Sequence, residues 1–240
     1  LVYASRFALV IRDEGKVVER QLFSAREAMQ VLGTATGALA RDLEQQWENL
    51  AKTHSPLQLG ERTIRLDQPQ IMGILNTTPD SFSAGGRHDA RADAVAHGQM
   101  LVGQGAQILD VGGESTRPGA HAVPVDMEIT RTAPVIRDLR AAGMTTHISI
   151  DTRKAAVAEA ALDAGASIVN DVSGFTYDRD LAPLCAARDV PVCVMHAQGD
   201  PQTMQTNPTY GDVLLDVYDF LADRIETLQA AGIAKGKIIA

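Results

Sequence analysis

From residue 71 onward, hydrophobic and polar positions define two alternating kinds of segment. The first kind is a short, mostly apolar run, and these runs span 71–76, 107–112, 146–151, 166–171, 190–196 and 237–240. The second kind has apolar residues three or four positions apart, roughly at 90–104, 125–141, 154–164, 179–188 and 210–231. Short apolar strands separated by amphipathic helices are typical of parallel strands covered by helices on their outer side.

Six such strands in succession favour one architecture over its main alternative. We predict an α/β fold of the (β/α)8 TIM-barrel type rather than a doubly wound sheet. The sixth strand, KIIA, stands at 237–240, so the barrel looks truncated after strand 6. A barrel without its last two strands would have an open seam with two unpaired edges. We therefore expect a partial sequence, and we expect these 240 residues by themselves to be unstable and inactive.

Residues 1–66 follow a different pattern and form a predicted N-terminal α+β extension, which leaves residues 67–240 for the barrel. Apolar runs at 7–12 and 16–23 predict two short strands joined by a turn at Glu14-Gly15. Ser24 and Glu27 have the spacing of a capping box, and an amphipathic helical stripe follows to residue 50. We expect this region to pack rather than to bind a ligand.

Composition excludes several classes of function. A hydrophobic content of 45% is enough for a sizeable core, and the net charge of −8 with scattered Lys and Arg argues against nucleic acid. We find no apolar run of the roughly 18 residues needed to cross a membrane and no signal peptide pattern, so we expect a cytoplasmic protein. Cys185 and Cys193 lack metal-ligand spacing and are expected to be reduced.

The ends of successive predicted strands are polar or ionisable. They are Asn76, Asp110, Asp151, the pair Asn170-Asp171 and the pair Met195-His196. In a parallel barrel these ends emerge at one rim, where active sites of this fold lie. A single Asn or Asp at such a place more often caps a turn, but five successive polar ends indicate a functional site.

Two loops at this rim and four side chains suggest the ligand. The loops after the first two strands, 76–87 and 112–124, are longer than the usual two to six residues and are typical of lids or substrate clamps. Arg117 is placed to meet an anion, or is a solvated loop arginine. A buried carboxylate such as Asp151 with an amide such as Asn170 suits a flat heterocycle with N–H donors. The neutral oxygen of Asn76 suits a hydrated hard cation, typically Mg²⁺ held against phosphate.

Five segments resemble the dihydropteroate synthases of the pterin-binding enzyme family, which sulfonamides inhibit. They are MGILNTTPDSFSAGG, ILDVGGESTRPGA, ISIDT, IVNDVSG and VCVMHAQGDPQTMQTNPTYGDV, collinear over about 71–240. The resemblance implies a (β/α)8 barrel, a homodimer and dependence on Mg²⁺. It also implies the condensation of 6-hydroxymethyl-7,8-dihydropterin diphosphate with p-aminobenzoate, which forms 7,8-dihydropteroate and releases diphosphate.

The resemblance assigns expected roles around the pterin. Asp151 and Asn170 match the contacts to the pterin ring, and Met195 lines the same pocket. Asn76 matches the ligand of Mg²⁺ and diphosphate. Asp110 matches a rim carboxylate, and we expect it to act with Asp151 as a catalytic group that stabilises positive charge on the pterin methylene carbon.

The resemblance also assigns roles on the p-aminobenzoate side. Thr116 matches a substrate contact, and Phe82, Arg117 and Pro118 lie on the loops that close over p-aminobenzoate and its sulfonamide mimics. We expect Arg117 to be catalytic as one of the cationic groups that stabilise the departing diphosphate. His196, in the MHxQG motif, is expected to be structural.

Two other functions stay open on the sequence. A methyltransferase that passes a methyl group from methyltetrahydrofolate to a corrinoid shares the barrel and the Asp/Asn pterin site, but the NTTPDSFS and GGESTRPG segments suit diphosphate and p-aminobenzoate better. A non-catalytic, truncated pterin-binding barrel is the second alternative. It is supported by the absence of the DPG motif, the lysine and the Arg-x-His pair that follow in the family.

Overall fold

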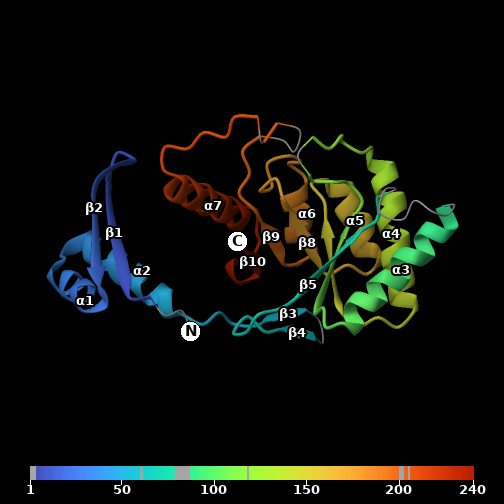
Figure 1. Ribbon diagram of the computed structural model, residues 1–240, viewed down its shortest axis with the longest axis horizontal. Coiled ribbons are helices and arrows are strands. Elements are labelled where there is room, and N and C mark those ends of the chain that lie inside the picture. The colour runs from blue at the N-terminus through green and yellow to red at the C-terminus, as the bar shows by residue number, and fades with distance from the viewer. Residues whose placement is uncertain (1–3, 60–61, 79–86, 118, 200–202, 205) are drawn as a thin grey trace. The chain divides into compact units, whose positions relative to one another are not determined.

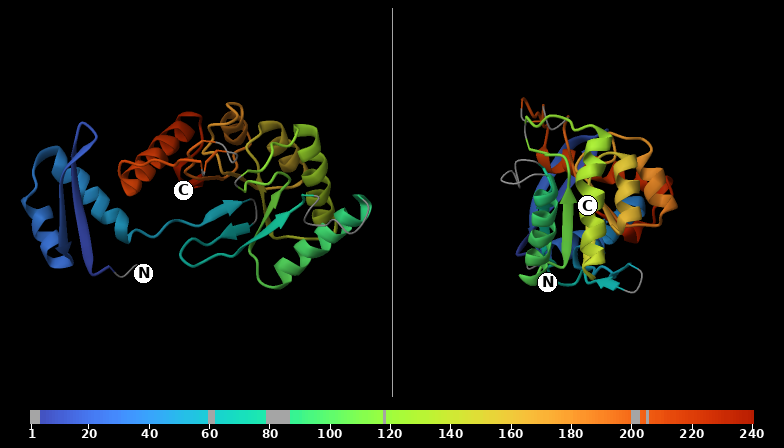
Figure 2. Two further views of the ribbon diagram at one scale, coloured as in Figure 1. Left: turned by 45° about the horizontal axis from the view of Figure 1, so that its top comes forward. Right: turned by 90° about the vertical axis from the view of Figure 1, so that its right-hand side faces the viewer.

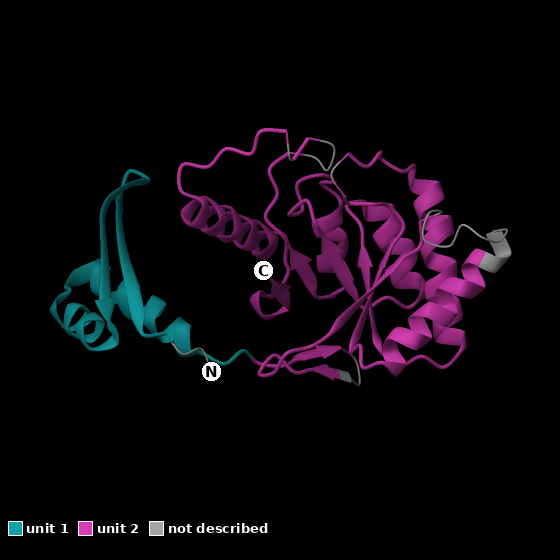
Figure 3. Cartoon of the chain, in the orientation of Figure 1, with its two compact units in different colours: residues 1–54 teal, residues 55–240 magenta. Residues whose placement is uncertain are grey.

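The computed structural model describes residues 4–59, 62–78, 87–117, 119–199, 203–204 and 206–240. The chain divides into two compact units, residues 1–54 and residues 55–240 (Figure 3). Unit 1 contains an antiparallel pair of strands followed by two helices. These elements are β1 (Arg6–Asp13), β2 (Lys16–Ser24), α1 (Ala25–Thr34) and α2 (Gly37–Ala51).

The local signals in unit 1 are confirmed with one exception. Glu14 and Gly15 both have positive φ (46° and 80°), as a tight hairpin turn between twisted strands requires. The backbone N–H of Ser24 donates to the Glu27 carboxylate at 2.8 Å, and the capping box is complete. The prediction of one continuous helix was wrong, because the chain leaves the helix after Thr34 and Gly37 restarts it with φ of 68°.

A short hairpin, which follows α2 in the chain, belongs to unit 2. It consists of β3 (Leu57–Leu59) and β4 (Arg62–Ile64), and it lies at the end of the large sheet where the strands begin (Figure 2). Leu57 and Ile64 are buried in a cluster with Ile108 and Ile168. The unit boundary therefore falls before this hairpin, not at the predicted residue 66, because the hairpin fills the inner side of the barrel sheet.

Unit 2 is built around a six-stranded parallel sheet with helices along its outer side (Figure 1). All six predicted strands are confirmed as β5 (Met72–Asn76), β6 (Ile108–Gly112), β7 (His147–Asp151), β8 (Ile168–Asp171), β9 (Val192–Val194) and β10 (Ile238–Ile239). The intervening helices are α3 (Arg87–Gly103), α4 (Val125–Ala141), α5 (Ala155–Ala164), α6 (Leu181–Ala187) and α7 (Val213–Ala230), and a 3-10 turn, Lys235–Lys237, precedes β10. Strands adjacent in the sheet are also adjacent in the chain, which is the order of a (β/α)8 barrel and not of a doubly wound sheet.

Alternate residues of each strand face two different environments. Outward residues such as Leu75, Leu109 and Ile148 are fully buried against helix residues, including Leu139 and Val157. The inward residues form the smaller apolar cluster near the hairpin and a polar group nearer the strand ends. The main apolar core therefore lies between the sheet and the helices, and polar side chains are left at the inner rim of the sheet, where they could bind a ligand.

Two further predictions concern cysteines and membranes. Cys185 and Cys193 are both free thiols, as expected. In the described parts of the chain, no helix combines the length and the apolar character that crossing a membrane requires.

Candidate active site

Four predicted site residues come together because of the register of the parallel strands. Asn76 pairs with Gly112, Gly112 with Asp151, and Asp151 with Asn170, so these positions form one row across the sheet. Residues in one row project to the same side, and so do residues two positions apart on a strand. Asp110 therefore lies on the same inner face as Asn170, one layer deeper than Gly112.

Contacts within this group agree with the register. Asn170 Nδ2 donates to Asp110 Oδ2 at 3.1 Å. A Cβ atom on Gly112 would lie 3.5 Å from Asp151 Oδ2 and 3.8 Å from Asn76 Oδ1. The glycine thus leaves a space between two oxygen atoms that converge on it, and Thr77 secures this end of β5 by donating its backbone N–H to Gly112 O at 2.8 Å.

The carboxyl groups of this inner face are strongly desolvated. Burial, together with the negative charges of Asp110 and Asp171, raises the pKa of Asp151 to about 8. Burial also raises the pKa of Asp110, against smaller opposing effects of the Ser149 hydroxyl and the Asn170 amide. Within the described ranges, Asp110 Oδ1, Asp151 Oδ1 and Ser149 Oγ are buried without a hydrogen-bond partner. Buried oxygens of this kind suit a ligand that brings N–H donors.

The loop residues predicted from the sequence lie at the rim. Thr116 is half-buried and Arg117 is exposed, both in the loop between β6 and α4. Met195 follows the end of β9 and is 46% exposed. Phe82 and Pro118, the other two predicted lid residues, lie outside the described residues.

Asp171 does not join the group, although the sequence placed it at the same strand end. It directly follows Asn170 and therefore points to the other face of the sheet. Its carboxylate accepts hydrogen bonds from Ser173 N at 2.7 Å, Ser173 Oγ at 2.9 Å and Phe175 N at 2.7 Å. Asp171 is thus a structural residue that holds the loop after β8.

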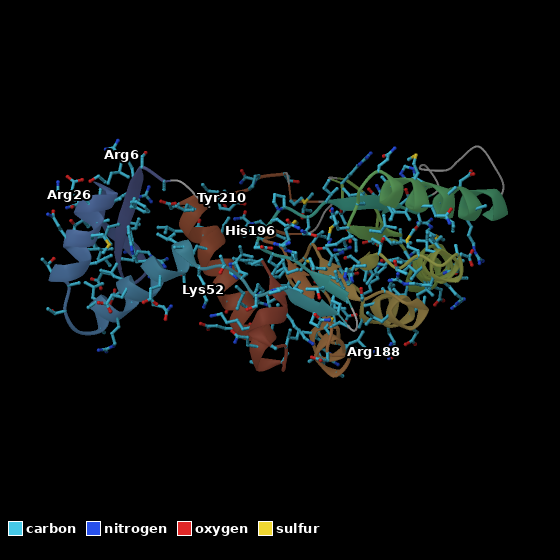
Figure 4. All side chains as sticks on the ribbon, turned by 90° about the horizontal axis from the view of Figure 1, so that it is seen from below. Arg6, Arg26, Lys52, Arg188, His196 and Tyr210 are labelled. Carbon is cyan, nitrogen blue, oxygen red and sulfur yellow. The ribbon has the colours of Figure 1, made fainter. Side chains whose placement is uncertain are left out.

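His196 has the packing role expected for it. Its ring contacts Phe220 edge to face at 4.9 Å between centroids, and Tyr210 at 5.8 Å (Figure 4). Gln198 of the same motif donates from Nε2 to Thr209 O at 2.8 Å. These contacts connect the segment after β9 to α7 and to the residues that precede it.

Sequence reasoning missed four charged residues beside the site. Glu114, Glu128, Arg153 and Lys154 are all buried and form ion pairs with one another. A signal was present, since Arg153 and Lys154 follow Asp151 almost directly and charged residues are unusual so close to a buried strand end. Among the described residues, no cluster of three or more His, Cys, Asp or Glu could hold a metal ion by itself.

Comparison with known proteins gives a consistent family assignment. The family model described as "Pterin binding enzyme" matches residues 72–240. The dihydropteroate synthase of Escherichia coli K12 is 44% identical over 177 residues, which cover 74% of this chain and 62% of that protein. Residues 1–71 lie outside the family match.

Solved structures agree with the sequence comparison. A Xanthomonas albilineans dihydropteroate synthase with 4-aminobenzoic acid has a TM-score of 0.70 and 44% identity, covering 78% of this chain and 65% of that one. A Burkholderia cenocepacia dihydropteroate synthase complexed with 7,8-dihydropteroate has a TM-score of 0.67 and 42% identity, covering 78% and 63%. The chain thus spans somewhat less than two thirds of the length of these relatives.

Proposed function

Because this chain belongs to the pterin-binding enzyme family, we propose that it acts in folate biosynthesis as a dihydropteroate synthase. The reaction joins 6-hydroxymethyl-7,8-dihydropterin diphosphate to p-aminobenzoate and releases diphosphate. The observation that carries this proposal is the row of Asn76, Gly112, Asp151 and Asn170 at the inner rim of the sheet. The relatives solved with 4-aminobenzoic acid and with 7,8-dihydropteroate support the choice of substrates.

The inner-face oxygens account for pterin recognition. A pterin ring presents several N–H donors, and Asp151 Oδ1 and Asp110 Oδ1 are buried acceptors without partners among the described residues. A ligand that donates to Asp151 would favour its ionised form and lower its raised pKa. Asn170, oriented by its bond to Asp110, offers an amide oxygen for a further N–H group.

The chemistry requires little of the protein beyond positioning and charge. The C–O bond between the pterin methylene carbon and diphosphate breaks, the aryl amine nitrogen forms a C–N bond, and that nitrogen loses a proton. Positive charge develops on the methylene carbon, and the carboxylates of Asp110 and Asp151 stabilise it electrostatically. An aryl amine is neutral and nucleophilic near pH 7, so no strong base is needed for its attack.

We propose Asn76 as the protein ligand of Mg²⁺. Its Oδ1 is a neutral oxygen at the exposed rim, beside the space over Gly112, and one such ligand suits an ion bound mainly through water and phosphate oxygens. Bound there, Mg²⁺ would neutralise charge on the departing diphosphate. Arg117, exposed on the loop after β6, is the cationic side chain that we assign to the same charge. A homodimeric assembly and a cytoplasmic location are proposed on the family resemblance alone.

Two measurements test the proposal. Calorimetric titration with the pterin diphosphate should show binding that Asp151→Asn abolishes, while Asp180→Asn, at an exposed carboxylate, should bind as the unchanged protein does. Diphosphate release should then depend on p-aminobenzoate. Methyl transfer to cob(I)alamin would assign the methyltransferase reaction instead, and binding without turnover would favour a non-catalytic module.

A further inference from the structure

The loop between β6 and α4 is held at its base by a buried group of four charges. We call this group the clasp, and it consists of Glu114, Glu128, Arg153 and Lys154. Lys154 Nζ lies 2.6 Å from Glu114 Oε2, 2.5 Å from Glu128 Oε2 and 2.7 Å from Val123 O. All three ammonium hydrogens thus have an acceptor.

The clasp closes the loop by binding both of its ends. Glu114 is at the start of the loop, and its Oε2 accepts the backbone N–H of Val123, near the end of the loop, at 2.7 Å. Glu114 Oε1 pairs with Arg153 at 2.7 Å. Val123 is therefore fixed through both its N–H and its C=O, and the described residues between the two ends of the loop, among them Thr116 and Arg117, extend from a closed base.

The clasp also fixes that base relative to Asp151. Arg153 and Lys154 lie two and three residues after Asp151, and the intervening Thr152 donates its hydroxyl to Glu128 Oε1 at 2.7 Å. A Cβ on Gly113 would lie only 2.8 Å from Thr132 Cγ2 and 3.2 Å from Glu128 O, so only glycine allows the strand end to lie this close to α4.

The same arrangement reaches the next loop around the rim. The Arg153 guanidinium carbon lies 4.1 Å from the centroid of the Tyr177 ring. Two residues after Arg153, the backbone N–H of Ala155 donates to Asp178 Oδ2, next to Tyr177 in the chain, at 2.8 Å. The loops that follow β6, β7 and β8 are thus joined through consecutive residues of one short segment, 153–155.

We propose that the clasp is a positioning device, which holds the described residues of this loop, such as Thr116, beside the pterin site so that they meet the second substrate, p-aminobenzoate. This inference rests on the proposed function. Burial of two acids and two bases is weak evidence for a contribution to stability alone, since desolvation offsets much of the attraction between them. The four charges join both ends of one rim loop to residues that closely follow Asp151 in the chain. A role in positioning that loop relative to Asp151 explains this placement.

Glu114→Gln is the variant that separates positioning from folding. It keeps an oxygen that can accept from Val123 N–H, but it removes the charge that pairs with Lys154 and Arg153. Glu159→Gln, on the exposed side of α5, is the matched control. Glu114→Asp keeps the charge and shortens the side chain, and it should show a smaller change than Glu114→Gln.

The first readout is hydrogen–deuterium exchange of the free protein. Glu114→Gln should raise exchange in peptides covering 113–124 and leave peptides from β7 and α5 unchanged. The second readout is kinetic: the KM for p-aminobenzoate should rise about 10- to 100-fold, as expected for a misplaced loop, while affinity for the pterin diphosphate stays the same.

Three outcomes would overturn the proposal. One is unchanged exchange at 113–124 in Glu114→Gln. Another is an equal loss of affinity for both substrates, which would indicate a general structural role. If Glu114→Gln fails to fold, Glu114→Asp replaces it. Exchange at 113–124 equal to that of the unchanged protein would then refute the positioning role of the clasp. Failure of the unchanged protein to bind pterin would refute the proposed function, and the exchange measurement would still test the clasp by itself.

Discussion

Replacing Asp151 by Asn should make the free protein less sensitive to pH at the same time as it removes pterin binding. The reason is the large difference between the pKa of this carboxyl in the folded protein, about 8, and its ordinary value of 3.8. Below pH 3.8 both the folded and the unfolded chain hold the proton. Between the two values only the folded chain holds it, and above pH 8 neither does. The stability that comes from this proton is therefore complete at low pH and is lost as the pH rises toward 8.

The size of the effect follows from proton linkage. In the window between the two pKa values, the free energy of unfolding falls by about 1.4 kcal/mol for each pH unit because of this one group. From about pH 5 to about pH 8 the loss is roughly 4 kcal/mol. Asn has no titrating proton, so the free energy of unfolding of Asp151→Asn relative to the unchanged protein should rise by roughly that amount over the same window.

Urea unfolding between about pH 5 and pH 8 measures this difference. The single tryptophan, Trp47, lies in unit 1, so unfolding of unit 2 is better followed by pulsed hydrogen exchange in peptides from β7. Asp180→Asn, at an exposed carboxylate, serves as the control, and its free energy of unfolding should change with pH as that of the unchanged protein does. If the free energy of unfolding of Asp151→Asn changes with pH as that of the unchanged protein does, the Asp151 carboxyl is not desolvated in the folded protein.

Three further predictions follow from the same coordinates. Pterin diphosphate binding at pH 7 should release about one proton from Asp151, because a ligand that needs the carboxylate must ionise it; titrations in buffers of different ionisation enthalpy measure this, and equal apparent enthalpies would contradict it. Gly113→Ala should destabilise unit 2 by about 1–3 kcal/mol through overpacking, whereas Gly103→Ala, with open space around it, should not; equal unfolding midpoints for both would contradict this. Leu57→Ala should destabilise unit 2 by about 2–5 kcal/mol, and Leu66→Ala, at a residue 37% exposed, by much less in the same urea titration; similar losses would mean that the hairpin does not fill the barrel.

Features encoded by local pattern could be predicted from the sequence. The six barrel strands were found because each is a short, mostly apolar run between amphipathic segments, as in ILDVGG for β6. The convergence of Asn76, Asp151 and Asn170 could be anticipated from topology alone, since parallel strands bring their carboxyl ends to one edge.

Features that depend on distant contacts could not be predicted in this way. Leu57 and Ile64 belong to strands of three residues, which are too short to show an alternating pattern, so their packing on Ile108 was not visible. The helical spacing of the sequence continues through position 36, although the chain leaves the helix after Thr34 and resumes it at Gly37. Glu114 was not singled out from the sequence, because its partners Arg153 and Lys154 lie in a different loop.

The inner face of β6 shows why the site suits a polar ligand and why, without a ligand, it lowers the free energy of unfolding. Its three inward residues run from Ile108, packed on the hairpin, through Asp110 to Gly112 at the rim. The apolar layer below excludes water from the carboxyls above it, which raises their pKa and leaves oxygens of Asp110 and Asp151 without partners in the described structure. A ligand with N–H donors would satisfy those oxygens and stabilise the folded state by mass action. The same desolvation that weakens the free protein at neutral pH would therefore favour binding of a ring with several N–H donors, such as the proposed pterin substrate.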